Sequence, residues 1–212
     1  MAYAGEMRGQ YEDAIIHRST MRDDMDLIQH WQDSCGPSML QTMAGEADPR
    51  FAWELNKLGD ISKIDPRETN GLAEQQKQWL EKYGGKAVPR GQTGKGIPMT
   101  EFLNEAIGPI IGAKIVCQVS TDIDTTLNRL AEILKTGYDV PLCVTWDASG
   151  SSNHFVVTLA VRGGNGQREF QIHDSWTGKT AWVSEANIRQ NKFSPIFDIY
   201  CRLSHYYEPF PN

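Results

Sequence analysis

The sequence predicts an α+β fold, in which an N-terminal helical part carries the helix that begins at Cys35 and packs on a C-terminal antiparallel β-sheet. Two observations predict this fold class. Between residues 26 and 136, apolar residues recur mostly at helical spacing, and Gly, Pro and Asn separate the segments. Between residues 140 and 204, β-branched and aromatic runs alternate with Gly, Ser and Asn turns. Helices followed by strands are typical of α+β domains.

The chain has 212 residues, which is enough to bury a sizeable core. We expect a single domain over residues 26–212, helical over 26–136 and β-rich over 140–204. Residues 1–25 are polar and of mixed charge, and we expect them to form an arm or a short helix.

The helices are placed by their apolar positions and by their ends. The first follows a candidate N-cap at Asp33 or Ser34 and has Pro37 in its first turn, where the missing N–H costs little. Gly84-Gly85 ends the third helix. The expected helices cover residues 35–44, 51–58, 72–83, 99–107 and 122–135, and a flexible surface loop rich in Gly and Pro is expected over 86–98.

The strands are predicted from apolar runs that favour β structure. One run precedes the last of these helices, and the others follow it. Gly163-Gly-Asn-Gly166 is expected to close a hairpin between two of them. The expected strands cover residues 110–119, 140–146, 154–162, 168–174, 180–183 and 196–203, with a short helix at 184–190.

The formal net charge is −6, and the basic residues are scattered along the chain. This balance argues against nucleic acid or an anionic membrane as the main partner. No apolar stretch approaches the roughly 18 residues of a membrane span, and residues 1–10 lack the basic and apolar regions of a Sec-type signal. We therefore expect no membrane span, and either a cytoplasmic location or export by a specialised secretion system.

The four cysteines show no metal-ligand spacing and no CxxC pair, so we expect no metal and no cofactor. Cys117, Cys143 and Cys201 lie in apolar runs that favour β structure, which favours buried free thiols. The sequence alone leaves a disulfide between two of them open.

Cys35 differs from these three cysteines, because it follows polar residues and precedes an apolar helical segment. At a helix start, unpaired N–H groups and the helix dipole favour the thiolate form. A thiolate nucleophile needs a base. His154 opens the apolar strand that ends near residue 162, and Asp174 ends the following strand. A hairpin would bring both to the same end of the sheet, where Asp174 can hold the imidazole in one tautomer.

The remaining requirement is a group that stabilises an oxyanion. The backbone N–H of Cys35 and the side-chain amide of Gln29, six positions upstream, are the candidates. Gln32 competes with Gln29 for this role, and His30 is a second candidate base. Other aromatic residues, Trp146 among them, are interpreted as core or groove-lining residues.

These segments resemble the papain-like cysteine peptidases, through Gln-x5-Cys-Gly at Gln29–Gly36, a late His opening an apolar strand and an acidic residue on the next strand. The closest resemblance is to the C39-like branch, related to double-glycine leader peptidases, in which Gly-His or Asn-His opens the strand, as Asn153-His154 does here. Asp174-Ser-Trp-Thr-Gly178 also resembles the Asn-Ser-Trp-Gly motif of papain, which implies that Trp176 covers the His154–Asp174 pair. Residues 45–120 show no correspondence, and Ser34 stands where the C39 branch often has Asp.

The resemblance implies a papain-like fold and a cysteine hydrolase that cleaves peptide (amide) bonds through a thioester acyl-enzyme. Its catalytic residues would be Cys35, His154, Asp174 and Gln29, with Gln32, Trp176 and Asn153 in support. The expected partner is a protein or peptide substrate. If the protein is a bacterial effector or toxin, we also expect an immunity, chaperone or secretion partner. Two alternatives stay open: a glutamine deamidase or amidase of the same fold, and a non-catalytic binding module.

Overall fold

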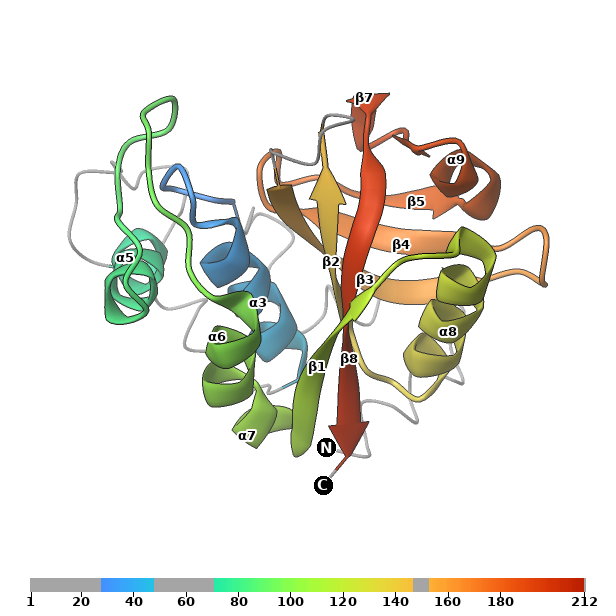
Figure 1. Ribbon diagram of the computed structural model, residues 1–212, viewed down its shortest axis with the longest axis horizontal. Helices are drawn as coiled ribbons and strands as arrows, with labels where there is room; N and C mark the ends of the chain where they lie inside the picture. Colours follow the sequence, from blue (N-terminus) through green and yellow to red (C-terminus); the bar gives the residue numbers. More distant parts are fainter. Residues whose placement is uncertain (1–27, 48–70, 147–152, 212) are drawn as a thin grey trace.

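The computed structural model of the protein describes residues 28–47, 71–146 and 153–211. The arm expected at residues 1–25 and the helix expected at 51–58 lie outside these residues. The described part of the chain is an α+β structure built on one antiparallel sheet, which confirms the predicted fold class (Figure 1).

The sheet has six strands in the order β1-β8-β2-β3-β4-β5, and every neighbouring pair is antiparallel. A separate two-stranded ribbon pairs β6 with β7. The strands are β1 (Ala113–Val119), β2 (Val140–Thr145), β3 (Asn153–Arg162), β4 (Glu169–Asp174), β5 (Thr180–Ser184), β6 (Lys192–Phe193), β7 (Phe197–Tyr200) and β8 (Arg202–Pro211).

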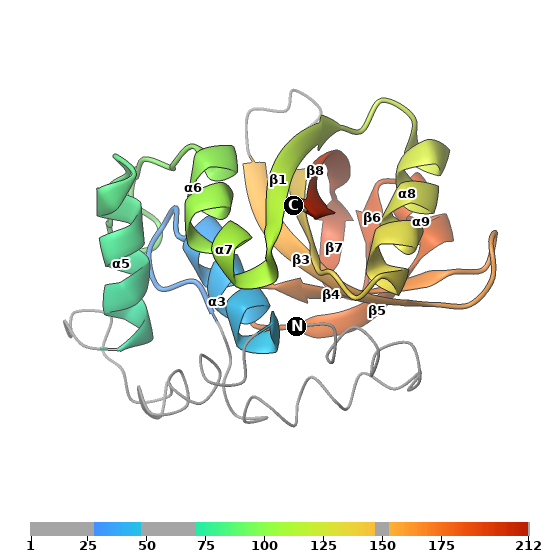
Figure 2. The same ribbon diagram turned by 90° about the horizontal axis from the view of Figure 1, so that it is seen from below.

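The helices lie on both sides of this sheet (Figure 2). Across the described ranges, none of them combines the length and the apolar character that a membrane span needs. The helices are α3 (Cys35–Ala47), α5 (Leu72–Lys82), α6 (Met99–Ala106), α7 (Gly108–Ile111), α8 (Ile123–Lys135) and α9 (Glu185–Arg189).

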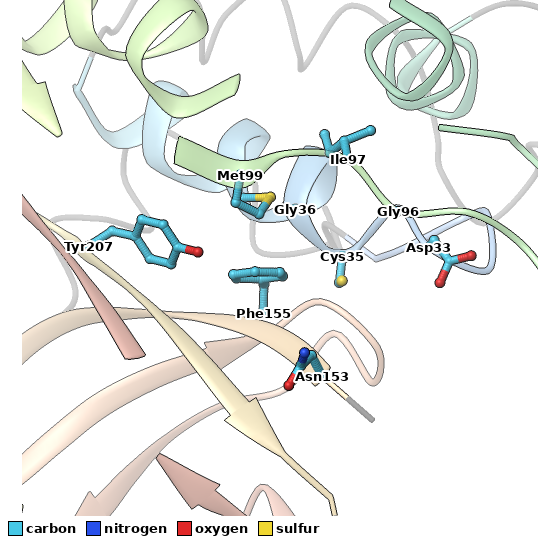
Figure 3. Close-up of a pocket in the computed structure, with 9 residues that line it drawn as sticks. All are labelled: Asp33, Cys35, Gly36, Gly96, Ile97, Met99, Asn153, Phe155 and Tyr207. Carbon is cyan, nitrogen blue, oxygen red and sulfur yellow. The ribbon is translucent and has the colours of Figure 1, made fainter. Parts of the chain in front are cut away.

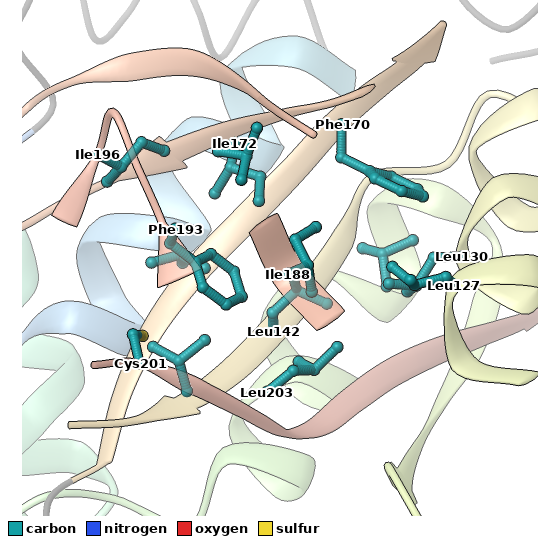
Figure 4. Packing of buried hydrophobic residues seen from close by; sticks show 14 of the residues in the cluster. Leu127, Leu130, Leu142, Phe170, Ile172, Ile188, Phe193, Ile196, Cys201 and Leu203 are labelled. Carbon is teal, nitrogen blue, oxygen red and sulfur yellow. The ribbon is translucent and has the colours of Figure 1, made fainter. Parts of the chain in front are cut away.

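Two apolar clusters fill the space between the sheet and these helices, because successive side chains of a strand point to opposite faces. On β3, Val157 joins Met39 and Leu40 of α3 in one cluster. Its neighbour Val156 joins the other cluster, which contains Leu127 of α8 (Figure 4). The sheet is thus buried on both faces, and α3 is held against the strand that carries His154.

The strand expected at 110–119 is shorter, because its first residues form the one-turn helix α7. Pro109 lies in the first turn of α7, where proline needs no N–H partner. Gly112 then ends the turn with a φ of 66°, a left-handed conformation that glycine adopts easily. Only after it does the chain extend as β1.

The last expected strand, 196–203, is two strands, and the second continues to Pro211. The break falls at Cys201, whose N–H donates to the Asn191 carbonyl instead of to a ladder. β8 pairs with β1 over the whole of β1. The sheet therefore includes β1, whose strand was expected at 110–119, and continues beyond residue 204 along β8. The pairing of β1 with β8 was not expected, because it is a long-range contact.

The segment 86–98, expected to be a flexible surface loop, is tied to the rest of the structure. Lys86 bridges to Lys95, and Pro89 bridges to Trp31. The side chain of Val88 is buried, and its carbonyl accepts a hydrogen bond from the Gln32 N–H at 2.9 Å. This loop therefore runs beside the chain that leads into α3.

Candidate active site

Cys35 is the first residue of α3, as the sequence predicts, and it is half-buried. Ser34, one of the two expected N-caps, directly precedes α3, and its carbonyl accepts the Ser38 N–H at 2.8 Å. Its hydroxyl donates to Gln76 Oε1 at 2.8 Å and has the Trp31 carbonyl as an alternative acceptor at 3.1 Å, so the side chain is engaged outside α3. The first N–H groups of an α-helix have no partner within the helix, so the Cys35 N–H, for which the described residues supply no acceptor, can bind a group beside the sulfur.

Gln76 of α5 holds the chain that leads into α3. Its Oε1 accepts hydrogen bonds from the His30 N–H at 2.9 Å and from the Ser34 hydroxyl at 2.8 Å. Its amide nitrogen donates to the Ile28 carbonyl at 2.9 Å and to Gln41 Oε1 at 2.8 Å. Sequence reasoning missed this role, because a glutamine on an amphipathic helix is ordinarily exposed, whereas Gln76 is fully buried.

The variant Gln76→Leu is expected to lower the free energy of unfolding by about 2–4 kcal/mol, because it leaves several buried polar groups without a partner. We also expect slower reaction of the Cys35 thiol, since the segment before α3 loses its anchor. Chemical denaturation and alkylation rates measure both effects. Gln78→Leu, on the exposed side of the same helix, is the matched control, and equal losses in the two variants would contradict the role of Gln76.

His154 and Asp174 lie on neighbouring strands and are joined by a hydrogen bond of 2.6 Å between Nε2 and Oδ1. In the β3–β4 ladder, Asp174 stands opposite Val156. Residues two apart on a strand share a face, so the carboxylate lies diagonally across from His154 on the same face. The expected hairpin over Gly163–Gly166 closes this pair of strands, with φ of 81° at Gly163 and 88° at Gly166.

The Asp174 carboxylate is fully buried and accepts several hydrogen bonds. Besides His154, its donors are the Trp176 N–H at 2.9 Å, the Thr177 N–H at 3.0 Å and the Thr177 hydroxyl at 2.6 Å. Burial alone would raise the pKa of this carboxyl, but these hydrogen bonds and the charge of His154 outweigh it and hold the pKa below its usual value. Asp174 is thus held as a carboxylate.

His154 is only 3% exposed, although it lies near the start of β3. Trp146 stacks on its ring with 5.1 Å between the ring centroids, and the edge of Phe197 approaches it at 6.0 Å. Burial opposes protonation, but the interactions with Asp174 and Cys35 outweigh it and raise the pKa of His154 to about 9. The imidazolium form is therefore favoured at neutral pH.

Trp176 occupies a different position from the one that the resemblance implies. Its ring stacks with the Arg90 guanidinium, 3.8 Å from the ring centroid, and its carbonyl accepts a hydrogen bond from Arg90 at 3.1 Å. Among the ring contacts of the described residues, Trp146 and Phe197 are the ones that cover His154. Trp176 contacts the His154–Asp174 pair through its backbone N–H, which donates to Asp174. Its contacts with Arg90 hold the loop 86–98 against the turn that follows β4.

Gln29 and Gln32 both line the cleft that contains Cys35 and His154. The Gln29 amide nitrogen donates to the carbonyls of Trp31, at 2.8 Å, and of Gln32, so both of its N–H groups are engaged. Gln32 has its oxygen held by the Gly91 N–H at 2.6 Å, and its amide nitrogen makes no hydrogen bond within the described residues. In this arrangement Gln32, the alternative to Gln29, has the free donor.

Two clefts meet at Cys35, and both are lined by Asp33, Cys35 and Asn153. One, of about 560 Å³, also contains His154, Trp146 and the two glutamines. The other, of about 430 Å³, has an apolar wall. Figure 3 shows the Cys35 sulfur pointing into this second cleft, with Asp33 on one side of it and Phe155, Met99 and Tyr207 on the other.

The other candidates lie away from these clefts. His30 lines neither of them, and burial together with the charge of Arg90 lowers its pKa. Cys117, Cys143 and Cys201 are free, and burial raises the pKa of Cys143 to about 11 and that of Cys201 to about 12. Over the described ranges, no group of three or more His, Cys, Asp or Glu side chains is arranged to hold a metal ion.

Comparison of the chain with models of known protein families and with curated proteins finds no match. The functional assignment therefore rests on the residues described above and on their geometry.

Proposed function

We propose that this protein is a cysteine hydrolase that cleaves peptide (amide) bonds through a thioester acyl-enzyme, with Cys35, His154 and Asp174 as its triad. One observation carries the proposal. Asp174 Oδ1 accepts a hydrogen bond of 2.6 Å from His154 Nε2, and the imidazole interacts with a cysteine that begins a helix and opens into a cleft. A nucleophile, a base and a group that orients the base are the parts of such a site.

In the first half of the reaction, the Cys35 thiolate attacks the substrate carbonyl carbon and forms a tetrahedral intermediate. As the C–N bond breaks, the His154 imidazolium donates its Nδ1 proton to the leaving nitrogen, and a thioester remains on Cys35. In the second half, neutral His154 takes a proton from a water molecule that attacks the thioester. The acid leaves, and the thiolate–imidazolium pair is restored.

The oxyanion of both intermediates would be bound by the Cys35 N–H and by a glutamine amide. The amide nitrogen of Gln32 has no acceptor in the part of the chain that the structure describes, whereas Gln29 would have to release one of its carbonyl partners to take the same role. We therefore assign the side-chain contact to Gln32, and leave Gln29 the role of shaping the turn before α3.

We further propose a papain-like fold, in its C39-like branch. The order of Cys, His and Asp along the chain supports it, as does the packing of α3 against the strand that carries His154. An acidic residue on the neighbouring strand is the third element of the resemblance.

A proteome cleavage profile tests the reaction. The wild-type protein and its Cys35→Ala variant would each be incubated with an intact proteome, and new peptide termini would be mapped by mass spectrometry. New termini that depend on Cys35 indicate a peptidase. Conversion of glutamine to glutamate without chain cleavage would instead indicate a deamidase of the same fold. Identical profiles together with an unreactive Cys35 would contradict a hydrolase and favour a binding module.

The pH dependence of the reaction follows from the pKa of His154. Because this pKa is raised, the imidazolium that protonates the leaving group is present below about pH 9 and is lost above it. We expect kcat/KM to fall on the alkaline side with a midpoint near pH 9 and by about tenfold for each further pH unit. A midpoint at the usual histidine pKa would contradict the proposed pair.

A further inference from the structure

We propose that Asp33 selects substrates that carry a cationic side chain, lysine or arginine, on the residue whose carbonyl is attacked. This inference rests on the proposed function, since it concerns what the same clefts bind. Asp33 is half-buried beside the nucleophile and lines both clefts at the point where they meet.

The roles of the two clefts follow from the position of His154. The group that leaves must receive a proton from this histidine, so it occupies the cleft that His154 lines. The acyl part then extends into the other cleft, whose far wall is formed by Met99, Phe155 and Tyr207. The substrate residue whose carbonyl carbon bonds the Cys35 sulfur then lies where the two clefts meet, beside Asp33.

Among the residues that the structure describes around Cys35, the Asp33 carboxylate is the charge without a partner of opposite sign. In the proposed mechanism the thiolate of Cys35 is matched by the imidazolium of His154. The carboxylate of Asp174 is matched by Arg90, whose charge interacts with it. Asp33 forms no ion pair or hydrogen bond within the described residues. Burial raises the pKa of the Asp33 carboxyl, and no cation in the described ranges is placed to oppose this shift. A bound ammonium or guanidinium group would supply that missing charge.

The shape of the site agrees with this assignment. Gly94 packs directly against Asp33, and a Cβ at position 94 would lie only 1.9 Å from Asp33 Oδ2. At Gly96, which lines the cleft of about 430 Å³ that would hold the acyl part, a Cβ would meet no atom within 4 Å. Glycine at position 94 thus leaves room for the Asp33 carboxylate. The open space at Gly96, in the lining that Asp33 shares, can take the stem of a lysine or an arginine.

A pair of covalent probes tests the selection. Acetyl-Leu-Lys vinyl sulfone and acetyl-Leu-norleucine vinyl sulfone differ only in the side-chain ammonium group, and each adds irreversibly to the Cys35 sulfur. Peptide mapping by mass spectrometry gives the labelling rate at Cys35 itself. We expect the lysine probe to react about five- to tenfold faster with the wild-type protein, as for a partly exposed ion pair, and the two rates to become equal in Asp33→Asn.

The control is Glu101→Gln, which removes the same charge from an exposed position on α6. It is expected to keep the preference for lysine. Equal rates for the two probes in the wild-type protein, or a preference that survives Asp33→Asn, would overturn the proposal.

A second measurement separates this proposal from the proposed hydrolase activity. Aminoethyl and sulfonatoethyl methanethiosulfonate are small reagents of opposite charge that form a mixed disulfide with a thiol and release methanesulfinate. The ratio of their reaction rates reports the electrostatic potential at the Cys35 thiol, even if the protein hydrolyses no substrate. We expect the cationic reagent to be favoured in the wild-type protein and this preference to shrink about fivefold or more in Asp33→Asn. An unchanged ratio would overturn the role of Asp33, whereas loss of hydrolysis alone would not.

Discussion

Replacement of His154 by glutamine is expected to lower kcat for amide hydrolysis by roughly 10³-fold or more, while the protein stays folded. Glutamine can still donate a hydrogen bond to Asp174, so the buried carboxylate keeps a partner. It cannot carry a proton between the sulfur and the leaving nitrogen. The proposed ion pair with Cys35 and the proposed acid that completes the cleavage would therefore both be lost.

His173→Gln is the matched control for this variant. His173 lies on β4, is also buried and bonds Thr180 Oγ1 at 2.9 Å, but it lines neither cleft. Steady-state kinetics and thermal unfolding of the two variants separate chemistry from folding. Retention of activity within tenfold in His154→Gln would rule out this histidine as the base, whatever the stability of the variant.

The variant Asp174→Asn is expected to lower kcat by roughly 10²–10⁴-fold and the free energy of unfolding by about 1–3 kcal/mol. The carboxylate accepts hydrogen bonds on both oxygens, from His154 and Trp176 on one and from Thr177 on the other. An amide has one oxygen and one NH₂ group. In either orientation, the NH₂ group faces N–H donors, so one side of the network is broken.

The same variant also moves the pH profile. Asp174 raises the pKa of His154 through its hydrogen bond and its charge. Without the carboxylate, burial is opposed by fewer interactions, and the alkaline limb of kcat/KM is expected to shift to lower pH. A pH–rate profile of Asp174→Asn measures this shift. An alkaline limb that stays in place would show that Asp174 does not hold the imidazolium.

Asp122→Asn provides the control for an Asp-to-Asn exchange. Asp122 is exposed and caps α8 by accepting the Thr125 N–H at 3.0 Å. Asparagine is about as good an N-cap as aspartate, so we expect near wild-type stability and an unchanged pH profile. A loss of activity comparable to that of Asp174→Asn would show that the effect is not specific to the site.

Local patterns in the sequence were sufficient to predict the α+β class and most helices and strands. Periodicity places α5, α8 and β2–β5, because the apolar spacing of an element is a property of a short segment. The place of Cys35 at the start of α3 and the hairpin that joins the strands of His154 and Asp174 are local in the same sense. For this reason, the sequence alone was enough to nominate these three residues together.

Long-range contacts decided the rest. The pairing of β1 with β8, the burial of Gln76 and the stacking of Trp146 on His154 each join segments far apart in the chain, and no spacing rule reports them. The hydrogen bonds of Gln29 and Gln32 also depend on where the loop 86–98 is held. Local sequence patterns were thus enough to nominate the nucleophile Cys35, the base His154 and the carboxylate Asp174 that orients it. The rings that cover His154, the free amide donor of Gln32 and the place of Asp33 beside the sulfur come from the whole fold, because burial and pairing depend on segments far apart in the chain.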